Sequence, residues 1–390
     1  MKKKILFFPF ELLSHYSRSL MLANSIKDQY EVQILYSEKY KSLIDEFNIP
    51  TFNCLSLDAE MILEHTKKFS FDWIQQEYIE KIFISQVQIV KQLKADIIIG
   101  DAMWTLKMVA EHSGVFYCSV VNAYMSTHYK EKRGLPSWHH ANIYLNVFPK
   151  GLSTKLVRIG EEFYFRKHHY TFKKIRNKYA LKPKVKLIEE LEGDITLICD
   201  HPDVFPLKKL PNDFYNIGPL YFENDKAEAI EVNVKKGKTI LVCMGSSGNF
   251  EKIEFFKDPV FNDYFFILIS QNEYQEFGEN FITKKFLNFN KVLPFIDLMI
   301  CHGGNGTLYY ALKHKVPVLA FTSHFEQQWN MNQIIKFNLG AILKENDSIL
   351  EIKKKIEYWV GQKGSLNTTF KINLNATVKK FREILIHNTK

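Results

Sequence analysis

The sequence predicts an α/β fold with two domains, each built around a parallel β-sheet that helices cover on both faces. Three observations support this prediction. The chain has 390 residues, which is long enough for two hydrophobic cores. Short apolar runs alternate with segments of helical periodicity, as βαβ units require. The alternation stops twice, at 124–185 and at 210–238, and begins again after each break.

The first half of the chain shows the alternation clearly. Between its first two strands, the segment 14–30 places Ser19, Leu22, Ala23 and Ile26 on one face of a helix. A second helix precedes Gly114, which can end it as a C-cap. We expect strands at 4–10, 31–36, 95–101, 115–123 and 194–200. The aromatic and charged segment 124–185 is expected to form loops and helices that shape a pocket.

The second half repeats the plan after a turn-rich connector. Strands are predicted at 239–244, 264–270, 298–301, 316–321 and 340–343. The last segment, 374–390, has the pattern of an amphipathic helix that returns to the first domain. The predicted domains are therefore residues 1–216, with a C-terminal helix of about 372–390 crossing back, and residues 217–371.

Composition favours a protein of a reducing compartment. The five cysteines are scattered without a CxxC pair and are expected to be buried thiols. The start of the chain imitates a secretion signal, but Pro9 and Glu11 interrupt its apolar run, so we expect a first strand and a cytoplasmic protein. No run approaches the ~20 apolar residues of a membrane span.

The net charge of +9 is partly local. The stretch 166–179 carries six Lys and Arg residues, with Phe172, Ile175 and Tyr179 among them. A solvated helix face is the simplest interpretation. A patch for an anionic membrane or an acidic acceptor is the alternative. Nucleic acid is not expected as a partner, because the sequence holds no recognised binding motif.

Polar residues follow several predicted strands directly. In open α/β sheets, ligands bind beyond the carboxyl ends of the strands. Four residues occupy such positions: His15 after 5–8, Asp101 after 97–99, Ser246 after 240–244, and His302 after 298–301. Random placement would seldom produce this pattern four times, so these ends are expected to carry the chemistry.

The sequence HGGNGT, 302–307, predicts a site for a diphosphate. Gly303 and Gly304 allow a tight turn close to a ligand, and Thr307 is expected to open the next helix. The first N–H groups of that helix favour an anion. His302, Asn305 and Thr307 can add donors. The motif lacks the GK[ST] of a P-loop and the GxGxxG of a dinucleotide fold. A turn with a stray histidine is the structural alternative.

Two further segments lie in corresponding places. The segment GSSGN, 245–249, occupies the first βα turn of the second domain and could face the same diphosphate or the sugar. The segment EQQWN, 326–330, begins with a carboxylate and an amide, which suit the adjacent hydroxyls of a sugar. An exposed polar loop is its alternative interpretation.

The run from His302 to Gly340 resembles the nucleotide-sugar signature of the UDP-glycosyltransferases, which are inverting enzymes of the GT-B fold that include natural-product glycosyltransferases. The resemblance extends to SHYSRSLMLA, ADIIIGD and LPNDFYNIGPL, so it covers most of the chain. It implies an acceptor-binding first domain and a nucleotide-sugar-binding second domain, which face each other across a cleft. It also implies the following roles: His15 as base and Asp101 as its partner; His302, Gly304, Asn305, Gly306, Thr307 and Ser246 at the diphosphate; Glu326 and Gln327 at the donor sugar.

The chemistry of these residue types agrees with the resemblance. An imidazole suits removal of a proton from an acceptor hydroxyl, and a carboxylate behind it fixes the tautomer. A helix N-terminus serves the departing diphosphate without a metal. We therefore expect no cofactor and no metal site, since no DxD pair is placed to bind one.

Three departures from the family pattern bear on specificity. Tyr310 stands in the ribose region where the family usually has Glu, which leaves a UDP-linked and a dTDP-linked donor both open. Ser14 replaces the usual Gly and Thr322 a common Pro. The expected function is inverting sugar transfer to a hydroxyl of a small, partly apolar acceptor. The alternatives are a membrane-associated glycolipid glycosyltransferase, a non-catalytic accessory protein and, less favoured, a sugar-nucleotide epimerase.

Overall fold

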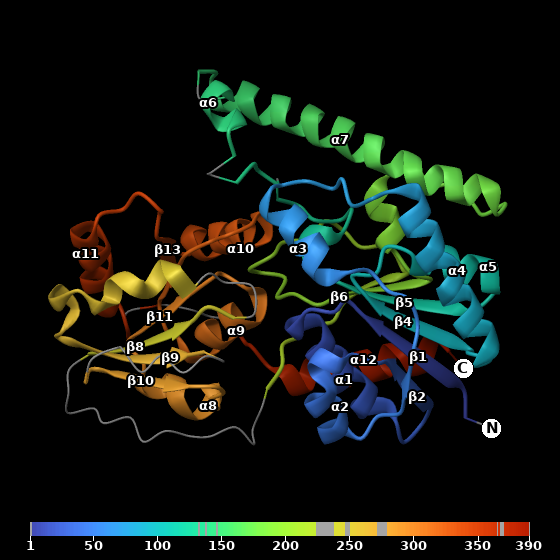
Figure 1. Ribbon diagram of the computed structural model, residues 1–390, viewed down its shortest axis with the longest axis horizontal. Helices are drawn as coiled ribbons and strands as arrows, with labels where there is room; N and C mark the ends of the chain where they lie inside the picture. Colours follow the sequence, from blue (N-terminus) through green and yellow to red (C-terminus); the bar gives the residue numbers. More distant parts are fainter. Residues whose placement is uncertain are drawn as a thin grey trace. The chain divides into compact units, whose positions relative to one another are not determined.

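The chain forms two compact units of α/β structure (Figure 1). The structure is a computed structural model that describes residues 2–131, 133–136, 139–145, 147–223, 238–245, 250–270, 279–364, 366 and 370–389. Unit 1 comprises Met1–Leu220 with Asn373–Lys390, and unit 2 comprises Tyr221–Ile372. This division lies close to the domain boundaries that the sequence predicts.

Unit 1 is built on a seven-stranded parallel sheet in the order β3-β2-β1-β4-β5-β6-β7. Its central strands are almost wholly buried, because helices cover both faces of the sheet. The strands are β1 (Lys4–Pro9), β2 (Glu31–Leu35), β3 (Thr51–Phe52), β4 (Ile97–Asp101), β5 (Phe116–Val121), β6 (Ile195–Ile198) and β7 (Phe214–Asn216).

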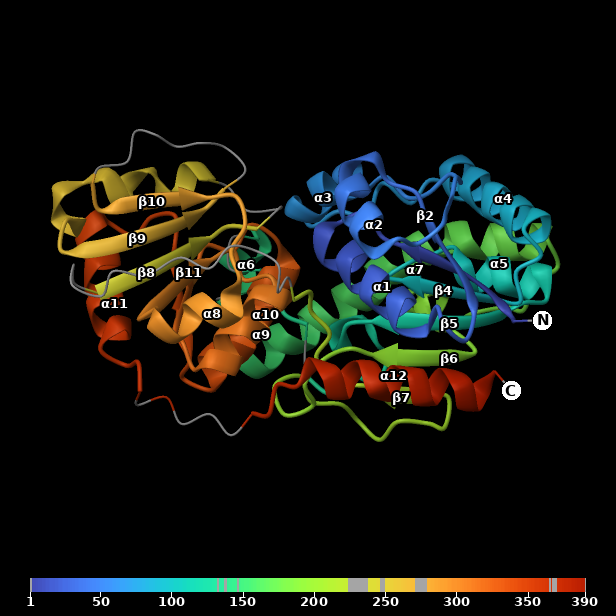
Figure 2. The same ribbon diagram turned by 90° about the horizontal axis from the view of Figure 1, so that it is seen from below.

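Helices cover both faces of this sheet (Figure 1). α1 and α12 pack against each other on one face, and α4 and α5 lie together on the other (Figure 2). Short 3-10 turns, including η2 (Ala123–Met125) and η3 (Leu187–Leu191), complete the unit. The helices are α1 (Leu13–Ile26), α2 (Lys41–Phe47), α3 (Ala59–Lys67), α4 (Gln76–Gln92), α5 (Leu106–Ser113), α6 (Ala141–Leu145), α7 (Lys150–Lys178) and α12 (Leu374–Asn388).

Unit 2 is built on a six-stranded parallel sheet in the order β10-β9-β8-β11-β12-β13. Its strands are β8 (Lys238–Cys243), β9 (Tyr264–Ile269), β10 (Phe281–Lys284), β11 (Leu298–Cys301), β12 (Val318–Ala320) and β13 (Gly340–Ile342). Its helices are α8 (Phe289–Val292), α9 (Asn305–His314), α10 (Phe325–Lys336) and α11 (Ile349–Val360).

The predicted fold class is confirmed, and the differences concern short strands at sheet edges. Three edge strands, β3, β7 and β10, have only two to four residues each. They therefore contain no long apolar run from which a strand could be predicted. The described residues of the interval 124–185 form loops and helices, with α7 as the main element. None of the helices within the described ranges is both long enough and apolar enough to cross a bilayer.

The strand orders place one switch point in each unit. In unit 1, the connections from β1 and β4 leave the sheet in opposite directions, and in unit 2 those from β8 and β11 do so. A crevice opens beyond the carboxyl ends of such a strand pair, and ligands bind there. The predicted residue His15 lies just beyond β1, and the predicted Asp101 ends β4. Gly245, which begins the predicted segment 245–249, follows β8, and the predicted His302 follows β11.

Candidate active site

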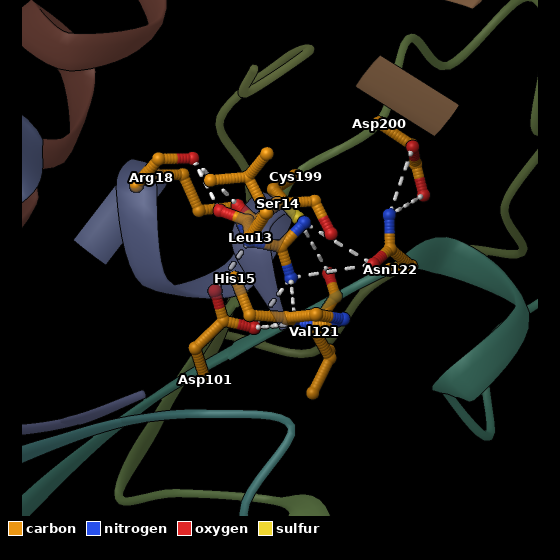
Figure 3. Close-up of polar contacts among 10 residues, drawn as sticks. Leu13, Ser14, His15, Arg18, Asp101, Val121, Asn122, Cys199 and Asp200 are labelled. Carbon is orange, nitrogen blue, oxygen red and sulfur yellow. Dashed lines mark hydrogen bonds and ion pairs between the residues drawn. The ribbon is translucent and has the colours of Figure 1, made fainter. Parts of the chain in front are cut away.

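The two residues that the sequence selects as base and partner meet at the switch point of unit 1 (Figure 3). His15 lies in the first turn of α1, just beyond β1, and Asp101 is the last residue of β4. The Nδ1 atom of His15 lies 2.7 Å from Oδ1 of Asp101. Both side chains are buried, at 7% and 2% exposure. Asp101 therefore does not cap a helix, since Thr105 occupies the N-cap of α5.

An arginine that the sequence analysis did not select completes this pair. Arg18, one turn after His15 on α1, is buried and grips both carboxylate oxygens of Asp101 through Nε and Nη2 (Figure 3). Burial acts to raise the pKa of the Asp101 carboxyl, but Arg18 and His15 outweigh burial and hold this pKa below its usual range. Asp101 therefore remains an ionised acceptor at neutral pH.

The ionised carboxylate fixes the tautomer of the imidazole. Because it can only accept hydrogen bonds, the Nδ1 atom of His15 carries the proton and the Nε2 atom keeps its lone pair. Nη2 of Arg18 lies 3.0 Å from the same Nδ1 atom, so a positive charge stands beside the ring. Phe10 contacts the ring edge-on, with 5.7 Å between centroids, and limits its rotation. The arrangement leaves the lone pair of Nε2 available to accept a hydrogen bond.

Two more polar residues extend the hydrogen-bonded cluster of His15, Asp101 and Arg18 along the same edge of the sheet. Asn122, just after β5, lies with its Oδ1 atom 3.3 Å from Nη1 and Nη2 of Arg18. Its Nδ2 atom lies 3.3 Å from both carboxylate oxygens of Asp200, and Oδ2 of Asp200 also accepts the N–H of Ala123 at 2.6 Å (Figure 3). The sequence analysis missed both, although each follows a buried strand in the runs VVN and LICD. The rule that selected Asp101 would have found them.

His302 in unit 2 is enclosed by two glycine turns. A Cβ atom on Gly304 would lie 2.2 Å from Nε2 of His302, and one on Gly245 would lie 2.4 Å from its Cε1 atom. Gly245 and Gly303 have φ angles of +62° and +85°, which favour glycine. Burial lowers the pKa of His302 to about 4, so the ring is neutral at neutral pH. Its Nδ1 atom has no hydrogen-bond partner among the described residues.

The helix that follows His302 presents an uncapped N-terminus. α9 begins at Asn305, with Gly304 as its N-cap and no capping side chain. The prediction that Thr307 opens the helix is therefore wrong by two residues, because glycine itself serves as the N-cap. Gly304, Asn305, Gly306 and Thr307 are partly exposed, while the Thr307 hydroxyl lies within hydrogen-bonding reach of the Cys243 thiol. Backbone N–H groups of this first turn can bind an anion.

α10 supports the glycine turn from beneath. Asn330, which is fully buried, donates from Nδ2 to the carbonyl oxygen of Gly303 at 3.1 Å. Gln327 accepts the backbone N–H of Ser323 with its Oε1 atom at 2.6 Å, so this oxygen holds the start of α10. Glu326 lies in the first turn of α10 and is partly exposed. Asn330 is a supporting residue that the sequence analysis did not separate from the rest of EQQWN.

The Tyr310 side chain contacts the start of the connector between the two units, at Tyr221 and Phe222. Its hydroxyl donates to the carbonyl oxygen of Phe222 at 2.8 Å, and its ring packs edge-on against Tyr221 and Phe289. The side chain is 8% exposed. Tyr310 therefore has a packing role here, and its assignment to the ribose stays a prediction.

Ser246, which is predicted to lie at the diphosphate, is outside the described residues. Within the described ranges, no group of three or more His, Cys, Asp or Glu side chains is arranged to hold a metal ion. All five cysteines are free, and burial raises the pKa of the Cys243 thiol to about 11 and that of Cys301 to about 12, so these thiols near the turn are unreactive.

Comparisons with known proteins find similar sequences. The glycosyltransferase family 28 C-terminal domain matches residues 265–384. A PGL/p-HBAD biosynthesis glycosyltransferase of Mycobacterium tuberculosis is 22% identical over 342 residues, covering 85% of this chain and 78% of the relative. A PGL/p-HBAD biosynthesis rhamnosyltransferase of Mycobacterium bovis is 20% identical over 342 residues, covering 85% and 74%.

Solved structures show the same fold. The glycotransferase of kitacinnamycin superimposes with a TM-score of 0.68 at 14% identity, covering 100% of this chain and 99% of that chain. The spinosyn rhamnosyltransferase SpnG, complexed with thymidine diphosphate, superimposes with a TM-score of 0.62 at 12% identity, covering 99% and 96%. The fold and the family match together define a glycosyltransferase of the GT-B class. In sequence and in fold, the chain is similar to GT-B natural-product glycosyltransferases.

Proposed function

We propose that the protein transfers a sugar, with inversion, from a nucleotide-diphosphate sugar to a hydroxyl of a small, partly apolar acceptor. The observation that carries the proposal is the 2.7 Å contact between His15 and Asp101 at the switch point of unit 1. Nε2 of His15 takes the proton of the acceptor hydroxyl as the oxygen attacks the anomeric carbon. Asp101 stabilises the imidazolium that forms.

The donor would bind to unit 2. The uncapped start of α9 would hold the diphosphate through N–H groups of Asn305, Gly306 and Thr307, with the buried His302 beneath. Glu326 and Gln327 would hold the sugar. The proposed reaction needs no metal, because the leaving diphosphate is stabilised by backbone N–H groups. A relative named as a rhamnosyltransferase and a structural neighbour with thymidine diphosphate favour a dTDP-linked donor over a UDP-linked one.

Arg18 acts in this proposal as a positioning residue. Its guanidinium group holds both carboxylate oxygens of Asp101, and Asp101 in turn orients the His15 ring. We expect Arg18→Met to lower kcat about tenfold or more and to leave the KM for the donor unchanged, because the donor is proposed to bind to unit 2. Arg18→Lys, which keeps the charge without the planar guanidinium, should recover only part of kcat. A purely structural role would lower the fraction of folded protein and leave kcat of the folded protein unchanged in both variants.

The proposed base is tested by substitution. His15→Ala should lose transfer by about 10²–10⁴-fold and should still bind the nucleotide. His387→Ala, at an exposed histidine of α12, is the matched control and should retain full activity. Thermal-shift measurements with UDP, dTDP and GDP identify the nucleotide and confirm binding by both variants. Full transfer activity of His15→Ala would overturn the assignment.

An accessory role remains the second candidate, since a nucleotide site without transfer would serve a protein that activates a partner. The buried His15–Asp101–Arg18 cluster argues against it, because such a protein has no need for a base held in one tautomer. Hydrolysis or transfer of the donor by the purified protein distinguishes the two functions. The acceptor could also be a glycolipid, as the names of the mycobacterial relatives suggest.

A further inference from the structure

α7 exposes a row of apolar side chains to solvent. Leu152, Leu156, Ile159, Phe163 and Tyr170 recur at helical spacing on one face and are 45%, 39%, 65%, 73% and 59% exposed. We call these five residues the α7 stripe. α6 and the turn after it add Ile143, Tyr144, Val147 and Phe148, which are also exposed. Nine of the nineteen exposed large apolar residues in the described part of the chain thus lie within 143–170.

The opposite face of α7 is packed into unit 1. Phe172 and Ile175 are fully buried, and α7 contacts α4 and η3 (Figure 1). The alternative interpretation of the sequence included Phe172 and Ile175 in a membrane patch at 166–179. For these two residues that interpretation is wrong, because both side chains belong to the core of unit 1. The apolar surface of the helix lies on the α7 stripe instead.

Cations surround the α7 stripe. Among the described side chains of α7, seven exposed residues are cationic and one, Glu162, is an exposed carboxylate. On a helical projection, Lys155 and Lys173 flank the stripe on one side, and Lys167 and Lys174 flank it on the other. The seven cations are Lys155, Arg158, Arg166, Lys167, Lys173, Lys174 and Lys178.

We propose that α6 and α7 form a docking surface for an anionic lipid bilayer, with the α7 stripe inserted at the level of the headgroups. An apolar stripe bordered by cations is the pattern of a helix that lies in the plane of a membrane interface. The bilayer supplies both an apolar layer and negative charge, which complements the excess of cations. Two copies of the chain would instead bring seven cations of each copy together, so self-association is disfavoured.

This surface contains none of the residues of the proposed reaction. His15, Asp101 and the α9 turn contribute nothing to it, so bilayer binding can be measured without donor or acceptor. This inference does not rest on the proposed sugar transfer, so a negative result for bilayer binding can be distinguished from a negative result for transfer.

Sedimentation with vesicles tests the proposal. The full chain should bind vesicles of phosphatidylcholine mixed with phosphatidylglycerol and should bind vesicles of phosphatidylcholine alone more weakly, by about fivefold for each cation that approaches the surface. High salt should weaken binding to the anionic vesicles. Absence of binding to anionic vesicles at low salt would overturn the proposal.

Paired variants identify the surface. Ile159→Glu/Phe163→Glu should weaken binding to anionic vesicles at least about tenfold, because two apolar contacts are lost and two negative charges are added. Leu350→Glu/Tyr358→Glu, at residues of α11 that are 65% and 53% exposed, is the matched control and should bind like the wild type. Lys155→Gln/Lys167→Gln/Lys174→Gln tests the cations alone and should reduce the salt dependence.

Three outcomes contradict the bilayer as the occupant. One is equal binding by the wild type and Ile159→Glu/Phe163→Glu, with both folded by circular dichroism. Another is loss of binding by the α11 control as well. The third is a dimer in sedimentation velocity that Ile159→Glu/Phe163→Glu dissociates, since this result would assign the stripe to a second copy of the chain.

Discussion

At the scale of single residues, the buried imidazole of His302 makes the stability of unit 2 depend on pH. The ring fills the space between Gly245 and Gly304, where a Cβ atom on either glycine would collide with it. Burial lowers its pKa to about 4, whereas an unfolded chain has a histidine pKa of about 6.5. Any contribution of His302 to diphosphate binding is therefore that of a neutral hydrogen-bonding group, and the α9 N–H groups supply the positive potential.

The lowered pKa of His302 predicts a pH dependence of stability. Between pH 6.5 and 4, His302 binds a proton in the unfolded chain but not in the folded chain. The free energy of unfolding therefore falls as the pH falls. By linkage, His302 alone contributes a loss of up to about 3 kcal/mol across this window. Urea unfolding of wild type and His302→Gln at pH 7 and pH 5 measures the difference. His387→Gln is the exposed control, and parallel pH dependences in all three proteins would contradict the assignment.

At the scale of elements, α7 is fixed by one buried ionic cluster. Arg176 donates to Glu190 through Nε and Nη2 and to Glu111 through Nη1 at 2.6 Å. His169 lies 3.0 Å from the same Glu190 carboxylate. Burial acts to raise the pKa of Glu190, but Arg176 and His169 outweigh it and lower this pKa. The cluster joins α7 to η3 and α5, so it anchors the C-terminal part of α7, in which the α7 stripe ends at Tyr170.

Loss of this anchor should destabilise unit 1 strongly. Arg176→Met leaves the buried carboxylate of Glu190 and the partly buried one of Glu111 without their cation, and such a change costs about 3–5 kcal/mol. Arg166→Met on the exposed face of the same helix removes only a surface ion pair and should cost about 0–1 kcal/mol. Chemical unfolding of both variants measures the two costs. Equal unfolding midpoints would show that the cluster does not stabilise the fold.

At the scale of the whole molecule, the longer strands of both sheets could be predicted from the sequence, because buried parallel strands are near-continuous apolar runs. The short edge strands β3, β7 and β10 could not. The proximity of His15 and Asp101 could be predicted as well, since each lies at or just beyond the end of such a run. Arg18 could not, because its role depends on a contact with Asp101, 83 residues away in sequence. The exposure of the α7 stripe also escaped prediction. The sequence of α7 is apolar on both faces, and only the packing of Phe172 and Ile175 shows which face is buried.

The two units are joined twice by the chain, because α12 follows unit 2 but packs in unit 1 (Figure 2). Phe381 and Leu385 are fully buried on its inner face, and α12 contacts α1. Phe381→Ala should lower the unfolding free energy of unit 1 by about 3–5 kcal/mol, whereas the exposed Arg382→Ala should change it by less than about 0.5 kcal/mol. The nucleotide binding proposed for unit 2 should be unchanged in both variants, as a thermal shift can show.

The return of α12 also orders events during synthesis. The segment that makes α12 leaves the ribosome only after all of unit 2, so the α1 face of unit 1 stays uncovered while unit 2 emerges and can already fold. A nascent chain stalled before Asn373 would carry a finished second half and an incomplete first half. During translation, the half of the protein that is made first is the last to be completed.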